Sequence, residues 1–288
     1  LAREKRRICG TMPAMRHNES LAKLKSGQLA LGLWFNSGNH ALARLLAAQG
    51  LMDWLLVDTE HCPTDLSMVA VLCAAIADVS GGRTTPLVRV VDGTIHHIKQ
   101  ALDAGAQGVM CPLVDTPEQA ARIVGYAKYP PQGVRGNGGL MPHLGFAMNR
   151  AQYTEAANRE TLVAVQIETK LAVENVDAIA AVPGVDVLFI GPNDLHISLG
   201  YGPSYWSDAP LFRDAADKVL AAAARHGKAA GILMGNATQA RARRADGFTF
   251  IGMGADTLTL LNAVGAGYAE VTGAAAPPGG WGAHLRMD

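Results

Sequence analysis

The feature that most constrains the fold is a repeated pattern in which a short apolar run is followed by a helical stretch. The runs are almost continuously hydrophobic, which is typical of parallel strands buried on both faces. Eight such pairs fall within about 250 residues, the number that closes a (β/α)8 TIM barrel. We therefore predict a single TIM-barrel domain over residues 1–288. The expected strands are residues 29–35, 54–57, 86–90, 108–111, 162–167, 185–190, 229–233 and 248–251.

Helical patterns separate the expected strands, and glycines such as Gly105, Gly184 and Gly227 end several of them. Gly is favoured just past a helix end, where the backbone turns left-handed. A doubly wound open sheet is the competing architecture, but no GxGxxG motif follows the first strand. The expected helices are residues 40–49, 66–78, 95–104, 117–128, 171–181, 211–226, 237–245 and 257–268.

Three segments fall outside this pattern. Residues 129–160 form a long connection that contains Pro130, Pro131 and several glycines. Such a connection in a barrel is usually an active-site cover or an interface element. Residues 1–17 and 273–288 are expected to be flexible tails.

The composition limits the kinds of molecule that this chain is expected to bind. The formal net charge is zero and 17% of residues are charged, which argues against nucleic acid or an anionic membrane as a partner. No apolar run reaches the roughly 18 residues of a membrane span. The four cysteines form no CxxC pair, so we expect reduced thiols and a cytoplasmic protein.

Polar residues gather where the expected strands end. Active sites of TIM barrels lie at the carboxyl ends of the strands. One such residue alone could be a helix cap or part of a structural ion pair, but several on one rim indicate a site. The residues are Asp58, Glu60 and His61 after strand two, Arg89 at strand three, Gln166 and Glu168 at strand five, and Gly191 to Asp194 after strand six.

Glu168 and Asp194 follow neighbouring strands, so their carboxylates should lie close together. Two uncompensated carboxylates repel each other and raise one pKa, and a hard cation removes that penalty. Two carboxylates completed by water and substrate oxygens suit Mg²⁺ or Mn²⁺, whereas zinc would favour His or Cys ligands. The alternative is that Asp194 is only a helix cap.

His61 and Arg89 are the expected reactive cations of the rim. Asp58, three positions before His61, could orient its imidazole for general acid–base work, or His61 could be a polar residue that merely caps the barrel. The Arg89 guanidinium suits a developing enolate oxygen or a substrate carboxylate. Gly191 permits close backbone approach, and the N–H groups near Asn193 open a helix that could hold a carboxylate.

Lysine placement bears on the mechanism. A Schiff-base aldolase needs an inward-facing lysine at a strand end. Lys170 is the one near candidate, and it starts a helix beyond Glu168, where we expect it on the surface. Metal activation is therefore favoured over imine chemistry.

Ordered motifs along the chain resemble the HpcH/HpaI aldolase family, which comprises metal-dependent class II pyruvate aldolases typified by 4-hydroxy-2-oxoheptanedioate aldolase. The resemblance extends from about residue 29 to residue 268. The motifs are Asp58-Thr-Glu-His-Cys-Pro63, Pro86-Leu-Val-Arg-Val90, Tyr129-Pro-Pro-Gln-Gly-Val-Arg-Gly136, Gln166-Ile-Glu-Thr169 and Phe189-Ile-Gly-Pro-Asn-Asp-Leu195.

The resemblance implies a role for each rim residue and for Asp103, an acid that would support the site of a neighbouring subunit. It also implies a homo-hexamer, a trimer of dimers, with the last helix exchanged between subunits. The implied roles are Glu168 and Asp194 as metal ligands, His61 as acid–base with Asp58 as its partner, Arg89 at the keto oxygen, and Gln166 beside the substrate. We expect Trp34, Gly191, Pro192 and Asn193 to line the substrate pocket together with Asp194.

The predicted function is reversible aldol cleavage of a 4-hydroxy-2-keto acid to pyruvate and an aldehyde. A divalent metal (Mg²⁺, or Mn²⁺ or Co²⁺) would stabilise the pyruvate enolate. Alternatives are an oxaloacetate decarboxylase, a macrophomate-synthase-like enolate enzyme, and a non-catalytic barrel that binds keto acid or metal. Two departures from the family, Asn193 in place of a small residue and the loop at residues 135–142, lie near the expected substrate entrance and leave the aldehyde open.

Overall fold

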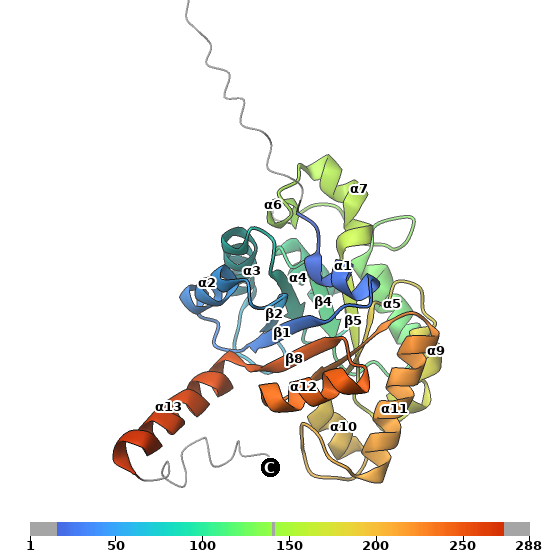
Figure 1. The fold of residues 1–288 in the computed structure, drawn as a ribbon. Coiled ribbons are helices and arrows are strands. Elements are labelled where there is room, and N and C mark those ends of the chain that lie inside the picture. Colours follow the sequence, from blue (N-terminus) through green and yellow to red (C-terminus); the bar gives the residue numbers. More distant parts are fainter. Residues whose placement is uncertain (1–15, 140–141, 274–288) are drawn as a thin grey trace, which may run out of the picture.

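The computed structural model describes residues 16–139 and 142–273 and forms a closed barrel (Figure 1). Its strands are parallel and follow chain order, and β1 pairs with both β2 and β8. This confirms the (β/α)8 prediction and excludes the open sheet. The strands are β1 (Ala30–Phe35), β2 (Trp54–Asp58), β3 (Thr85–Arg89), β4 (Gly108–Cys111), β5 (Leu162–Ile167), β6 (Val187–Ile190), β7 (Ala229–Leu233) and β8 (Phe250–Ala255).

Helices surround the barrel, and the last of them extends away from it in Figure 1. The helices are α1 (Glu19–Lys25), α2 (His40–Gln49), α3 (Leu66–Ser80), α4 (Ile95–Asp103), α5 (Pro117–Ala127), α6 (Pro142–Gly145), α7 (Arg150–Glu160), α8 (Lys170–Glu174), α9 (Val176–Ala180), α10 (Pro192–Ser198), α11 (Pro210–Arg225), α12 (Ala237–Asp246) and α13 (Asp256–Thr272). None of the described helices is long and apolar enough to cross a membrane.

Large side chains fill the barrel interior. Trp54 and Phe250 stack with ring centroids 4.5 Å apart, and Leu21 of α1 is buried in the same cluster. A Cβ at Gly32 would lie 1.9 Å from the Trp54 ring, so the indole occupies the space that a side chain there would need. Because the interior is packed, the barrel is not a pore, and ligands have access to it only at its ends.

Strand β8 continues past the expected end at residue 251 to Ala255. This extension contains Gly252 and Gly254. Because Gly is disfavoured in strands, the sequence did not predict that the strand continues. The close approach explains Gly252, since a Cβ would lie 3.1 Å from the Trp34 ring and 3.0 Å from Leu233. The strand therefore needs this glycine to pass a side chain that lines the upper barrel.

The connection at residues 129–160 differs from the prediction in two ways. Helices α6 and α7 lie within it, and Asn149 and Gln152 form a capping box that starts α7. The connection joins α5 to β5, so it lies at the amino ends of the strands, and Gln107, just before β4, donates to its Gly145 carbonyl. It therefore does not cover the active-site rim of its own chain.

The predicted tails fall mostly on residues 1–15 and 274–288, which lie outside the described residues. The predicted N-terminal tail nevertheless has defined contacts at its end. The Arg16 guanidinium contacts Asp78 at 3.1 Å, and the His17 ring lies 3.0 Å from Glu160. Asn18 then caps α1 and donates to the Gln107 carbonyl, which fixes α1 against the amino ends of the strands.

Candidate active site

The candidate site is a cavity of about 200 Å³ at the carboxyl ends of the strands. It brings together nine of the predicted site residues, and Glu168 lies directly behind Gly191 and Gln166. The structure therefore brings these predicted residues together at one end of the barrel. The predicted residues that line the cavity are Trp34, Asp58, His61, Arg89, Gln166, Gly191, Pro192, Asn193 and Asp194.

Arg89 and Asp58 form a buried, two-point ion pair. Arg89 Nε donates to Asp58 Oδ1 at 3.0 Å and an Arg89 terminal nitrogen donates to Oδ2 at 2.6 Å. Burial alone would raise the pKa of Asp58, but the hydrogen bond and charge of Arg89 outweigh it and leave that pKa below its usual value. Asp58 is therefore an ionised anchor for Arg89.

This pairing corrects the prediction that Asp58 orients the His61 imidazole. Asp58 Oδ1 also accepts from the backbone N–H groups of Glu60, at 3.0 Å, and His61, at 3.4 Å. The carboxylate thus positions the His61 backbone, not its ring. The ring is exposed, and its Nε2 lies 3.7 Å from Glu60 Oε1.

Glu60 was predicted to lie on the rim, but no role was predicted for it. Its Oε2 lies 3.0 Å from an Arg89 terminal nitrogen, so Arg89 contacts two carboxylates. The pKa of Glu60 lies above its usual value, mainly because the carboxyl group is buried. The charges of Arg89 and His61 lower this pKa, whereas the charges of Asp58 and Asp194 raise it. Its contact with Arg89 assigns it to the anchoring of that guanidinium.

Glu168 is buried at the base of the site. Its Oε1 accepts the Leu113 N–H at 2.7 Å, and its Oε2 accepts from the Gln166 amide. Burial is the main cause that raises the pKa of Glu168 to about 7, with the charges of Asp194 and Glu60 adding to it. Leu113 has a left-handed backbone with φ 53°, so a strained turn directs this N–H to the carboxylate.

Asp194 is the fourth residue in the turn that follows β6. It lies in the first turn of α10, whose N-cap is Gly191, so the alternative that Asp194 caps the helix is wrong. Its side chain is exposed toward the rim and its charge acts on both Glu168 and Glu60.

The donor set fits a hard divalent cation in part. Within residues 16–139 and 142–273, no group of three or more His, Cys, Asp or Glu side chains is placed to hold a metal ion. Glu168 and Asp194 supply two carboxylates, and the buried Gln166 Oε1 has no hydrogen-bond partner in the described part of the chain. Such oxygen donors, completed by water and substrate, suit Mg²⁺ or Mn²⁺.

Asp103 lies elsewhere in its own chain. It ends α4, which runs away from the rim, and it pairs with Arg135 at 3.0 Å. Arg135 also donates to the Tyr153 hydroxyl at 3.0 Å, which ties Asp103 to the 129–160 connection. The direction of α4 places Asp103 at the opposite end of the barrel from its own chain's rim, and its role at the site of a neighbouring subunit stays a prediction.

The cavity has further lining residues that the sequence did not identify. Asn36 follows β1, Cys62 follows His61, and Tyr205 lies between α10 and α11. Cys62 belongs to the second-strand motif but was given no role, Asn36 carries no motif of its own, and Tyr205 lies far from any expected strand end. Lys170 is exposed at the start of α8, as predicted, and does not line the cavity.

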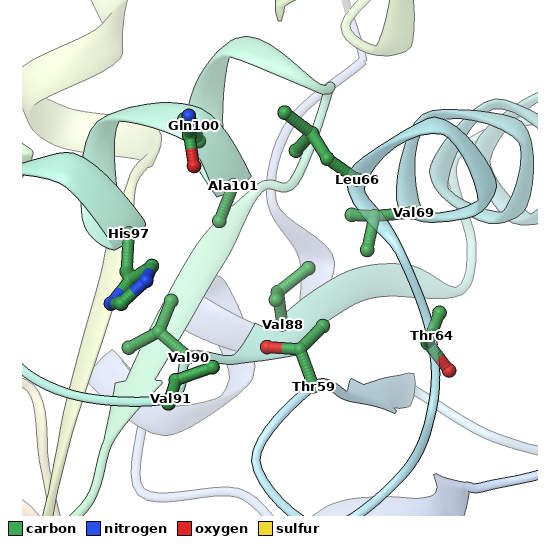
Figure 2. Close-up of a pocket in the computed structure, with 10 residues that line it drawn as sticks. All are labelled: Thr59, Thr64, Leu66, Val69, Val88, Val90, Val91, His97, Gln100 and Ala101. Carbon is green, nitrogen blue, oxygen red and sulfur yellow. The ribbon is translucent and has the colours of Figure 1, made fainter.

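A second cavity, of about 150 Å³, lies outside the barrel between α3 and α4 (Figure 2). Thr59 and Thr64, from the loop that carries His61, line one side, and His97 of α4 lines another. Its lining residues include no carboxylate, so it does not offer the metal-binding chemistry of the rim.

The chain is similar to members of one enzyme family over most of its length. The family model described as HpcH/HpaI aldolase/citrate lyase matches residues 30–263. A hydroxypyruvate/pyruvate aldolase of Deinococcus radiodurans is 40% identical over 242 residues, which cover 83% of this chain and 84% of that protein. A 2-keto-3-deoxy-L-rhamnonate aldolase of Salmonella dublin is 36% identical, with 88% and 92% covered. A crystal structure of an HpcH/HpaI aldolase/citrate lyase family protein from Burkholderia cenocepacia superposes with a TM-score of 0.81 at 37% identity, with 88% and 99% covered.

Proposed function

Because the chain belongs to the HpcH/HpaI aldolase/citrate lyase family and is a carbon–carbon lyase of the aldolase type, we propose that it cleaves a 4-hydroxy-2-keto acid reversibly to pyruvate and an aldehyde. The observation that carries the proposal is the rim cavity, in which acidic oxygen donors lie beside a buried, doubly anchored arginine. The names of the relatives support a keto acid as the substrate.

Glu168 and Asp194 are the proposed ligands of a divalent metal, Mg²⁺ or alternatively Mn²⁺ or Co²⁺. When bound, the metal would act as a Lewis acid that stabilises negative charge on the keto oxygen. Gln166 holds Glu168 through its amide nitrogen and presents its free oxygen beside the same place. Gly191 leaves room for the Glu168 carboxylate, since a Cβ there would lie 2.0 Å from Oε2.

The protein residues divide the remaining chemistry. In cleavage, His61 accepts the proton of the C4 hydroxyl, the C3–C4 bond breaks, and its electron pair passes to the C2 oxygen as the pyruvate enolate. Arg89 presents fixed positive charge to that oxygen, because Asp58 and Glu60 hold its guanidinium from two sides. The aldehyde leaves, C3 takes a proton from water to complete pyruvate, and His61 releases the proton that it accepted.

We further propose that the chain forms a hexamer, a trimer of dimers, with α13 packed on a neighbouring subunit. The exposed apolar side chains of α13 support this, with Leu260 and Val264 each 60% exposed. Asp103 could then support only the site of another subunit. Sedimentation should give a mass near six chains of 30.2 kDa, and a monomer would contradict the assembly.

An aldol-addition assay tests the function. Pyruvate and a panel of aldehydes are incubated with Mg²⁺, Mn²⁺ or Co²⁺, and the new hydroxy-keto acid is measured. We expect activity that a chelator removes and that falls at least about 10³-fold in Glu168→Gln and Asp194→Asn. Lys170→Met is the control and should leave the activity intact. Full, chelator-resistant activity in both carboxylate variants would sink the proposal, as would a borohydride-trapped lysine adduct.

A further inference from the structure

We propose that the rim cavity selects an uncharged hydroxyaldehyde as the acceptor, and that the side-chain amides of Asn36 and Asn193 bind its hydroxyl group. The inference rests on the proposed function, because the acceptor must meet the pyruvate enolate in this cavity. It concerns the half of the reaction that the pyruvyl-binding residues leave unspecified.

Asn36 is held at the end of β1 in a fixed backbone position. Its N–H donates to Asp256 Oδ1 at 2.8 Å, and the next N–H, of Ser37, donates to Oδ2 at 3.2 Å. Asp256 is itself buried and also accepts the Thr257 N–H at 2.8 Å, at the start of α13. The backbone at Asn36 is therefore fixed, which places the base of its side chain at the cavity wall.

The polar atoms around this wall have hydrogen-bonding capacity left over. The side-chain oxygens of Asn36 and Asn193, and the indole N–H of Trp34, are shielded from solvent and lack a hydrogen-bond partner within the described residues. All three residues line the cavity. Buried polar groups are nearly always hydrogen-bonded, so three orphans around one cavity indicate a polar ligand that completes them.

The charges of the cavity argue against an anionic acceptor. Arg89 is the one arginine or lysine among the described lining residues, and it is held by Asp58 and Glu60 and assigned to the pyruvyl oxygen in the proposed reaction. Phe189 and Leu233, which also line the cavity, offer no charge. A second carboxylate on the acceptor would therefore be desolvated without a cation of its own.

A hydroxyl group matches what the amides require. A hydroxyl both donates and accepts, and an amide end offers one acceptor and two donors, so the two groups pair in either orientation of the amide. An acceptor without the hydroxyl would leave the amides unpaired. A site that is built to hydrogen-bond a substrate hydroxyl rejects the analogue that lacks it.

The experiment compares glycolaldehyde with acetaldehyde, which differ by one hydroxyl group, and adds glyoxylate as a charged acceptor. The aldol product is measured with pyruvate and Mg²⁺ for the wild type, Asn36→Ala and Asn193→Ala. We expect the wild type to prefer glycolaldehyde by about 10-fold or more in kcat/KM over both other acceptors. In each variant the preference over acetaldehyde should fall to about 3-fold or less, through a higher KM for glycolaldehyde.

Exchange of the pyruvate methyl protons into deuterated water, without acceptor, serves as the second readout. It tests the proposed function alone, and we expect the metal-loaded wild type to catalyse it. Asn39→Ser, in the same loop, keeps its capping oxygen for α2 and does not line the cavity, so it should retain the wild-type preference. Normal exchange with equal use of glycolaldehyde and acetaldehyde by the wild type, or an unchanged preference in both variants, overturns the inference. Loss of exchange in both variants also overturns it, because the asparagines would then serve the pyruvyl half.

Discussion

At the scale of single residues, the site depends on pairs of charges more than on any one group. Arg89 contacts Asp58 at two points and Glu60 at a third, which only a planar guanidinium can do. Leu113 contributes through its backbone alone, since its side chain is 57% exposed while its N–H holds Glu168. The Glu168 carboxylate is thus positioned by the backbone of a residue whose side chain has no polar group.

Replacing Arg89 by lysine tests the importance of this geometry. Arg89→Lys keeps the charge but cannot span both carboxylates, so we expect kcat to fall about 10²-fold. Thermal unfolding should show a loss of about 1–3 kcal/mol, because part of the buried Asp58 charge loses its partner. Arg241→Lys, at an exposed position on α12, is the matched control. A variant with wild-type kcat would show that the two-point contact is dispensable.

At the scale of elements, strand pairing and strand ends decide which side chains meet. Asp58 and Arg89 are register partners of β2 and β3, which explains their ion pair. An apolar run in the sequence identifies a strand but not its register with the neighbouring strand. The sequence therefore could not show whether Asp58 pairs with Arg89 or with His61. The rim itself was predictable, because apolar runs mark the strands and each polar motif follows directly.

The turn from β6 into α10 gives a prediction at this scale. Gly191→Ala places a Cβ 2.0 Å from Glu168 Oε2, so the carboxylate must move, although the Gly191 φ of −81° suits any residue. We expect Mg²⁺ or Mn²⁺ affinity, measured by calorimetry, to fall about 10- to 100-fold. Gly202→Ala serves as the control, because a Cβ there meets nothing within 4 Å. Unchanged metal affinity in Gly191→Ala would argue against Glu168 as a ligand.

At the scale of the whole molecule, the directions of the strands and helices place two groups of charged residues at opposite ends of the barrel. Strands carry Glu168 and Arg89 to the rim, whereas α4 and the 129–160 connection place Asp103 and Arg135 at the far end. The order of strands and helices was sufficient to predict this separation. Residues 129–160 were nevertheless predicted to be either an active-site cover or an interface element. What the sequence of one chain cannot specify is which groups a second subunit brings to the rim.

Stability against pH is a further property of the whole fold. His196 joins α10 to α11, with its ring stacked on Phe212 at 3.7 Å between centroids, and burial lowers its pKa. Between that pKa and the ordinary value, the unfolded chain binds more protons, so the free energy of unfolding falls as pH drops from 7.5 to 5.5. This group contributes at most about 1.4 kcal/mol per pH unit.

Urea unfolding of the wild type and His196→Gln at both pH values measures this effect. Glu168, with its raised pKa, acts in the opposite direction over the same range, so the comparison of the two proteins isolates His196. The variant should lose less stability on acidification than the wild type does. Equal losses would show that the His196 ring does not resist protonation.

The central claim is that Glu168 and Asp194 hold a divalent metal with which the rim activates pyruvate. The most direct test follows the methyl signal of pyruvate by proton NMR in deuterated water, without any aldehyde. We predict that the metal-loaded wild type exchanges the methyl protons, that a chelator stops the exchange and Mg²⁺ restores it, and that Glu168→Gln remains at the uncatalysed rate. Exchange that persists in the chelated protein or in Glu168→Gln would contradict the account.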